Sequence, residues 1–386
     1  MKRGTSARVA IAFDIDGVFK YGREWSADGL AALQKASSHG MPFVFVTNGG
    51  GGLTEATYGS HLKDKVVSAG GQAAAHAELA VPEAKRMVLS YTPWESQLCP
   101  DLRESKVLLV GDPKEKVIEV AKAYGLKKAV HYSDYAQQHP TVNPFRAAME
   151  AGTSHTAVAN ATKQPISAKT QSFLSLADAA ASEAADPFKA ILVMCDPYLW
   201  YEAIQVSVDV LCSPTPLQLE YDPHAEPMPI HFSNPDFLSK FEHPYPRFAQ
   251  GAFKIALRAL YEAKLRALRV AEETIGEKLG ASFRQWGKPT EATFRFVEQR
   301  LRDLAPGGAG PVAAERFYMV GDNPASDMEG VRRANIFHRG STTSWKGVLV
   351  KTGVYKEGDE TNGAAVVVKG VGEAVDWILE QEAKMN

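Results

Sequence analysis

Two aspartates stand one residue apart at the end of an apolar run near the start of the chain. The run Val9–Phe13 ("VAIAF") leads into Asp14, and Asp16 follows two positions later. Side chains two positions apart on a strand leave it on the same face, so these carboxylates would crowd together. A hard cation such as Mg2+ would compensate, because it takes carboxylate and phosphate oxygens as ligands. Taken alone, the pair is equally compatible with a solvated acidic turn.

A second apolar run, Phe43–Val46, ends in small hydrogen-bonding groups. The hydroxyl of Thr47, the amide of Asn48 and the backbone N–H groups beginning at Gly49 could hold phosphate oxygens. An ordinary turn is the alternative, since Asn-Gly is a common turn pair. The four glycines at 49–52 are not a P-loop, because no Gly-Lys-Ser/Thr follows them.

Lys288 lies in "WGKPTEATF", directly before a proline and a predicted helix start with Thr290 as its cap. Such a lysine could point at a site rather than along a helix face. The alternative is a solvated surface charge, which is the usual state of a lysine.

A third strand pattern, "RFYMVGD", ends in Asp322, and Asp327 follows five residues later. The alternative for Asp327 is a helix N-cap, a common use of aspartate. "VGD" also occurs at 110–112, so only the second aspartate distinguishes the later copy.

These groups are positioned by short apolar runs that alternate with helical patterns at both ends of the chain. Strands buried on both faces and separated by helices indicate a parallel α/β sheet, doubly wound and Rossmann-like. Ligands bind such sheets at the carboxyl ends of the strands, where all four groups are expected.

The middle of the chain has strand and helix patterns of its own. We therefore predict a discontinuous core domain of residues 1–90 and 234–386 and an inserted α/β domain of residues 91–233. Residues 151–186 are rich in Ala, Ser and Thr and have little periodicity, which is typical of a variable excursion. Three aromatic residues near a predicted strand end, Tyr198, Trp200 and Tyr201, are candidate substrate contacts, although packing at a helix start is the stronger interpretation.

Residues 251–283 carry one long helical pattern with a rough apolar stripe. A helix packed on the core sheet is the stronger interpretation, and a partner interface is the alternative. The stripe comprises Leu257, Leu260, Tyr261, Leu265, Leu268, Ile275 and Leu279.

Composition excludes several classes of protein. The chain of 386 residues has a net charge of -2, which argues against a nucleic-acid binder. No apolar run reaches the roughly 18 residues of a membrane span. Three cysteines are too few for a disulfide framework, so an intracellular protein is expected, cytoplasmic or mitochondrial.

The ordered set DxD, Thr-Asn, Lys and GDxxxxD resembles the haloacid dehalogenase superfamily over the whole chain. The large insert between the Thr-Asn and Lys groups, together with "GKP" and "SNPD", resembles class IIA, the nitrophenylphosphatase-like group with an α/β cap. "TNGGG", "HFSNPDF", "YPRFAQGAFKIAL" and "VLVKTGVY" are similar to the cat eye syndrome critical region protein 5 family, except between about 151 and 186.

The resemblance implies a Mg2+-dependent hydrolase of a small phosphorylated substrate. It makes Asp14 the nucleophile that forms an aspartyl-phosphate and Asp16 the acid and base, whose backbone carbonyl also binds Mg2+. Asp14 and Asp322 supply carboxylate ligands, while Asp327 orients Lys288 or a metal-bound water.

The resemblance also implies that Lys288, Thr47 and nearby backbone N–H groups bind the phosphoryl oxygens. The inserted domain acts as a lid, as closing domains do in general. Class IIA relatives often dimerise, which leaves a homodimer open.

Two other functions stay open at this stage. One is a binding or scaffold protein that retains a vestigial site, and the other is a phosphotransferase that uses an acceptor other than water. The substrate itself cannot be read from the sequence, because the residues that select it carry no motif.

Overall fold

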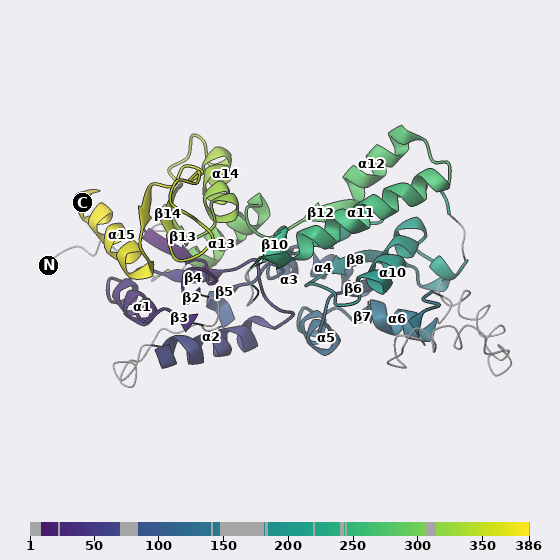
Figure 1. The fold of residues 1–386 in the computed structure, drawn as a ribbon, viewed down its shortest axis with the longest axis horizontal. Coiled ribbons are helices and arrows are strands. Elements are labelled where there is room, and N and C mark those ends of the chain that lie inside the picture. The colour runs from purple at the N-terminus through teal and green to yellow at the C-terminus, as the bar shows by residue number, and fades with distance from the viewer. Residues whose placement is uncertain are drawn as a thin grey trace. The chain divides into compact units, whose positions relative to one another are not determined.

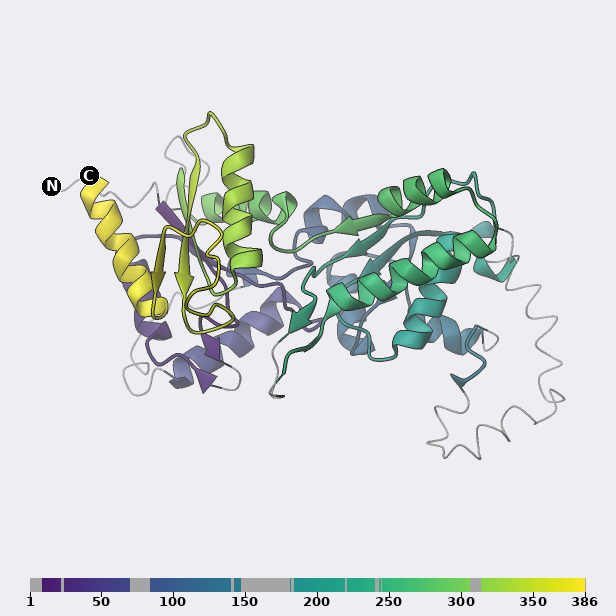
Figure 2. The same cartoon turned by 45° about the horizontal axis from the view of Figure 1, so that its top comes forward.

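The computed structural model describes residues 9–21, 24–69, 84–139, 142–146, 181, 184–218, 221–239, 243, 245–305 and 314–385. Most of the predicted excursion at 151–186 lies outside these residues. The chain forms two units, each shown in Figures 1 and 2. The first contains Met1–Glu95, Ser233–Phe248 and Gln285–Asn386, and the second contains Ser96–Phe232 and Ala249–Arg284.

The first unit is built on a six-stranded sheet whose paired strands are all parallel. Chain order runs from β1 outward to β4 and β5, then returns to β13 on the other side of β1. The point where the order reverses therefore lies between β1 and β13, which is where such sheets bind ligands. The strand order is β15 (Val366–Val368), β14 (Ser344–Val350), β13 (Arg316–Gly321), β1 (Val9–Phe13), β4 (Phe43–Val46) and β5 (Met87–Val88).

Helices cover both faces of this sheet, as the predicted α/β class requires. In Figures 1 and 2, α1 (Gly29–Ser38) and α15 (Val371–Met385) lie on one side, and α13 (Glu291–Asp303) and α14 (Glu329–Phe337) lie on the other. Alternate residues of β1 face opposite layers, since Ala10 and Ala12 pack with the α13 and α14 side. The unit also contains α2 (Glu55–Ala69), the hairpin β2 (Lys20–Tyr21) with β3 (Glu24–Trp25), and the hairpin β10 (Leu238–Ser239) with β11 (Arg247–Phe248).

The second unit has its own sheet, in which β6, β7, β8 and β9 pair in parallel. Its core joins alternate strand residues to the inner faces of the helices. The strand order is β12 (Phe283–Gln285), β9 (Ile230–Phe232), β8 (Phe188–Val193), β6 (Lys106–Val110) and β7 (Lys128–His131). The longer helices are α5 (Lys114–Ala123), α6 (Tyr132–Gln138), α10 (Trp200–Cys212), α11 (Gln250–Ala267) and α12 (Glu272–Ser282).

The structure differs from the predicted domain division at Ala249–Arg284, which belongs to the second unit rather than to the core. The apolar stripe of α11 packs into the second core through Phe253, Leu257, Tyr261 and Leu265. The stripe therefore does mark a packed helix face, but the helix packs on a different sheet from the one expected.

The predicted single helix over 251–283 is also wrong, because α11 ends at Ala267 and α12 begins at Glu272. Arg269 adopts a positive φ of 60°, which a continuing α-helix does not allow. Two members of the predicted stripe, Leu260 and Leu268, are exposed rather than buried in the core. Among the described residues, no helix is long and apolar enough to cross a membrane.

Candidate active site

Asp14 and Asp322 meet at the switch point of the first unit's sheet. Asp14 follows the last residue of β1, and Asp322 follows the last residue of β13. The parallel register pairs Phe13 with Val320, and the backbone N–H of Asp14 donates to Val320 O at 2.8 Å. Two strands that end together thus place two carboxylates side by side.

Lys288 brings a positive charge into this group. Its Nζ lies 2.9 Å from Asp14 Oδ1 and 2.6 Å from Asp327 Oδ1. Only 1% of the Lys288 side chain and none of the Asp327 side chain is exposed. Charges buried this deeply are retained only when they are paired, so the arrangement is a built cluster rather than a set of surface charges.

The electrostatics of the cluster show an excess of negative charge. Burial raises the pKa of Asp14 well above its usual value, and Lys288 only partly opposes this while Asp327 and Asp322 add to it. Burial and then the charge of Asp327 raise the pKa of Asp322 to about 7. For Lys288, burial lowers the pKa, but Asp14 and Asp327 outweigh it and the net shift is upward. Three carboxylates thus share one ammonium group.

The same carboxylates fit a hard metal ion. Asp14, Asp322 and Asp327 each offer an oxygen, and these oxygens lie within 4.8 Å of one another. Oxygen donors are the set that Mg2+ and Ca2+ prefer. A divalent cation would also supply the positive charge that the raised pKa values of Asp14 and Asp322 call for.

A loop after β14 fixes the carboxylate of Asp322. The backbone N–H of Val354 donates to Asp322 Oδ2 at 2.6 Å, and Thr352 Oγ1 donates to Gly17 O at 2.5 Å. A Cβ on Gly353 would overlap Asp322 Oδ2, so this close approach requires glycine. The loop therefore holds both the carboxylate of Asp322, which could bind a metal ion, and the turn that follows Asp14.

Asp16 occupies a different environment from Asp14. Its side chain is 56% exposed and forms an ion pair with Lys20 at 3.0 Å. One aspartate of the pair is thus buried beside Lys288 and the other is open to solvent. This division suits one carboxylate that binds a cation, Asp14, and one that exchanges protons, Asp16.

The Thr-Asn group lies at the end of β4, but its contacts differ from those predicted. Thr47 Oγ1 accepts the backbone N–H of Gly49 at 3.0 Å. Asn48 Nδ2 donates to Lys288 O at 3.0 Å and to Asp236 Oδ1 at 3.1 Å, while Asn48 Oδ1 accepts the N–H of Lys288 at 2.7 Å. Both amide protons of Asn48 are therefore used, which corrects the expectation that its amide holds phosphate oxygens.

Asp327 lies in a π-helical turn, Pro324–Met328, and is not the N-cap of a helix. Asn323 caps that turn, and the backbone N–H of Asn323 donates to Asp327 Oδ2 at 3.1 Å. With Oδ1 on Lys288, both oxygens of Asp327 have donors. Asp327 is therefore placed to orient Lys288.

Three features of the site were missed in the sequence. Asp236 contacts Asn48, the loop Thr352–Val354 holds Asp322, and Tyr58 has its pKa raised by burial and then by the charges of Asp16 and Asp14. "SNPD" and "VLVKTGVY" contain Asp236 and the loop Thr352–Val354, respectively, and resemble the family, but no local chemistry in them predicts a contact with the site.

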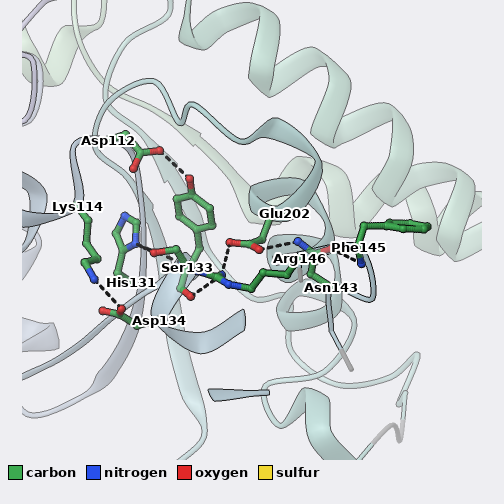
Figure 3. Close-up of polar contacts among 10 residues, drawn as sticks. Asp112, Lys114, His131, Ser133, Asp134, Asn143, Phe145, Arg146 and Glu202 are labelled. Atoms are coloured by element: carbon green, nitrogen blue, oxygen red, sulfur yellow. Dashed lines mark hydrogen bonds and ion pairs between the residues drawn. The ribbon is translucent and has the colours of Figure 1, made fainter. Parts of the chain in front are cut away.

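The second unit carries its own polar residues at strand ends, shown in Figure 3. Asp112, after β6, accepts the Tyr132 hydroxyl at 2.6 Å and the Tyr198 N–H at 2.8 Å. Nearby, the buried carboxylate of Glu202 accepts from Arg146 at 2.9 Å and from Asn143 at 2.6 Å. Each of these two carboxylates therefore has hydrogen-bond donors from within the second unit.

The aromatic residues predicted as substrate contacts divide between packing and exposure. Trp200 packs against Phe253 at the start of α10, with ring centroids 5.4 Å apart. Tyr201 contacts Phe145 at 5.6 Å, and Tyr198 is the most exposed of the three at 71%. Packing at a helix start accounts for Trp200.

The first unit is thus an α/β unit whose parallel sheet gathers three aspartates and a buried lysine at its switch point. Two family models match the chain: a haloacid dehalogenase-like hydrolase model at residues 11–127 and a HAD-hydrolase-like model at residues 285–374. The chain belongs to the haloacid dehalogenase-like hydrolases.

Curated relatives cover the full length of the chain. The mitochondrial hydrolase YKR070W of Saccharomyces cerevisiae is 28% identical, covering 98% of this chain and 97% of the relative. A cardiolipin synthase (CMP-forming) / mitochondrial hydrolase fusion protein of Schizosaccharomyces pombe is 26% identical over 98% of this chain, which spans 55% of that protein.

Solved structures confirm the fold. A 4-nitrophenylphosphatase of Thermotoga maritima has a TM-score of 0.58 at 15% identity, covering 97% of this chain and 98% of that one. A glycerol phosphate phosphatase of Mycobacterium tuberculosis in complex with magnesium has a TM-score of 0.53 at 16% identity, covering 96% and 78%. The nitrophenylphosphatase-like resemblance is thus confirmed at the level of the fold, while closeness to the cat eye syndrome critical region protein 5 family stays a prediction.

Proposed function

We propose that this hydrolase is a Mg2+-dependent phosphatase acting on a small phosphorylated metabolite. One observation carries the proposal: Lys288 Nζ lies between Asp14 and Asp327 in a cluster that also contains Asp322. The names of the solved relatives, which include phosphatases and a magnesium complex, support the same choice.

In the first step, the Asp14 carboxylate attacks phosphorus and forms an aspartyl-phosphate while the bond to the leaving oxygen breaks. Asp16 gives that oxygen its proton, which requires the access that the exposed side chain of Asp16 has. In the second step, Asp16 takes a proton from a water that attacks phosphorus, which releases phosphate and restores Asp14.

Lys288 serves both steps as a fixed positive charge. Two of its three ammonium protons point at Asp14 and Asp327 in the described part of the chain, and the third is available for a phosphoryl oxygen. Its upward pKa shift keeps it protonated at neutral pH. Asp14, Asp322 and the backbone carbonyl of Asp16 would hold the metal ion, which supplies charge stabilisation at the phosphoryl oxygens.

A panel of phosphomonoesters assayed with Mg2+ tests the proposal. Turnover is expected for the wild type and is expected to be lost in Asp14→Asn, which keeps the size of the side chain but removes the nucleophile. Product analysis separates hydrolysis from phosphotransfer, since only hydrolysis yields one free phosphate per turnover. Turnover that survives Asp14→Asn would show that the nucleophile is assigned wrongly.

Mitochondria are the compartment we propose, because both yeast relatives carry that word in their names. Fractionation of cells that express the full chain with a C-terminal tag tests this. Recovery of the tagged protein in the cytosolic fraction alone contradicts it.

A further inference from the structure

Lys288 is held in place through its backbone as well as through its ammonium group. The Asn48 side chain makes both hydrogen bonds that the Lys288 peptide groups offer, one to the N–H and one to the carbonyl. The contact joins residues 240 positions apart in the sequence. An amide side chain paired in this way fixes the direction in which the lysine leaves the chain.

Asp236 in turn fixes Asn48. Its Oδ1 accepts the second proton of Asn48 Nδ2 at 3.1 Å, and its own N–H is tied back to Asn234 Oδ1 at 2.8 Å. This acceptor agrees with the orientation that the N–H and the carbonyl of Lys288 already require, because it takes the second proton of the Asn48 amide nitrogen. The Asn48 oxygen must therefore face the N–H of Lys288, and the orientation of the amide is set rather than free to reverse.

Close packing around Gly287 leaves little room for any other arrangement. Gly287 has a φ of +80°, and a Cβ there would lie 2.5 Å from Ser233 O and 2.9 Å from Asn48 Oδ1. The segments 233–236 and 287–288 thus lie against each other at Asn48. A displacement of one segment would be passed to the other.

We infer that Asp236 is a positioning residue for Lys288 and acts through the Asn48 amide. The inference rests on the proposed function only insofar as Lys288 acts in hydrolysis. Asp236 holds the amide, the amide holds both backbone groups of Lys288, and Lys288 then reaches Asp14 and Asp327.

Removing the acceptor tests the chain of contacts. In Asp236→Ala, Asn48 loses its anchor, and kcat should fall about 10–100-fold, the usual cost of losing a supporting partner, with KM changed by less than about threefold. Asp236→Asn keeps an oxygen acceptor and should retain kcat within about threefold. A merely structural role would not produce this split between kcat and KM or the rescue by asparagine.

Hydrogen exchange at the Lys288 amide gives a readout that needs no activity. Its N–H donates to Asn48 Oδ1, so Asp236→Ala should speed its exchange by about tenfold or more, whereas Asp236→Asn should leave it slow. The matched control is Asp209→Ala, which removes another aspartate that accepts from a side-chain amide, that of Gln205, in the second unit.

The outcomes separate the two claims. Unchanged exchange and unchanged kcat in folded Asp236→Ala overturn the positioning role, as does an equal loss in Asp209→Ala or in Asp236→Asn. If the wild type hydrolyses no phosphomonoester, the proposed function fails, and exchange at Lys288 alone decides whether Asp236 positions it.

Discussion

The same tripeptide, Val-Gly-Asp, ends one strand in each unit of this protein, and the two aspartates have different surroundings. Asp322 of the first unit lies with Asp14 and Asp327 around one lysine. Asp112 of the second unit accepts two hydrogen bonds from neutral donors, a tyrosine hydroxyl and a backbone N–H. Neutral donors can satisfy one carboxylate, but three carboxylates around one ammonium call for a cation. The partners of a strand-end aspartate, rather than its motif, thus decide whether it forms a site.

The largest expected difference between the two strand-end aspartates, Asp322 and Asp112, is in the effect of their substitution on turnover. Asp322→Asn removes a charge from the metal-type cluster and should lower kcat by at least about 100-fold. Both donors of Asp112 reach its Oδ2, so Asp112→Asn keeps an acceptor for them and should cost only about 1 kcal/mol of stability, with kcat almost unchanged. Steady-state kinetics on both folded variants measures this, and equal losses in the two would remove the distinction between the units.

Two glycines extend the comparison: Gly353, which packs against Asp322, and Gly111, which precedes Asp112 in the chain. A Cβ in Gly353→Ala would displace Asp322 or the Val354 N–H that holds it, so kcat should fall about 10–100-fold. A Cβ in Gly111→Ala would lie 2.7 Å from Cys195 Sγ in the second unit and should lower the melting temperature while leaving kcat of the folded protein intact. Full activity in Gly353→Ala contradicts the role given to the loop after β14.

Metal removal provides a readout on stability. At a Mg2+ concentration 100 times Kd, binding to the native state should add about 2.7 kcal/mol to the free energy of unfolding of the wild type. Asp322→Asn should lose most of this gain, and Asp112→Asn should keep it. Thermal unfolding with Mg2+ and with a chelator measures the difference, and a gain that survives in Asp322→Asn would place the metal elsewhere.

Asp322 in the first unit and His231 in the second should make contributions to stability that change with pH in opposite directions. The pKa of Asp322 is raised from 3.8 to about 7, so in metal-free protein the native state keeps a proton that the unfolded state loses. Its contribution to stability therefore falls as pH rises from about 4 to 7. Burial and then Arg284 lower the pKa of His231 in β9 from 6.5 to about 4, so its contribution falls as pH drops through that window.

Denaturant unfolding from pH 4.5 to 8 in the presence of a chelator, monitored by hydrogen exchange in peptides of each unit, measures the contributions of Asp322 and His231. Each group changes the slope by at most about 1.4 kcal/mol per pH unit. Asp322→Asn should flatten the response of the first unit, and His231→Gln should flatten that of the second. Unaltered slopes in these variants contradict the assignment of the two groups.

Much of the candidate site followed from the sequence because its residues are tied to strand ends. The runs before Asp14, Thr47 and Asp322 are short and apolar, so each strand and its terminal polar group could be located. The placement of Lys288 in the same site as these residues was predicted from the resemblance to the family and not from the local pattern around Lys288.

The missed features depend on contacts between distant segments. The orientation of the Asn48 amide is set by Asp236 and by the Lys288 backbone, which lie 188 and 240 positions away. An amphipathic stripe shows that α11 buries one face, but it does not show which sheet that face packs on. The break after Ala267 carries neither glycine nor proline, so no turn signal marked it.

Trapping of the covalent intermediate tests the central claim most directly. The enzyme is mixed with a phosphomonoester that it turns over, quenched in acid and reduced with borohydride, which converts an aspartyl-phosphate to homoserine. The account predicts homoserine at position 14 that depends on substrate, with Asp16, Asp322 and Asp327 unmodified. An active enzyme that yields unmodified Asp14, or a modification at another aspartate, would contradict it.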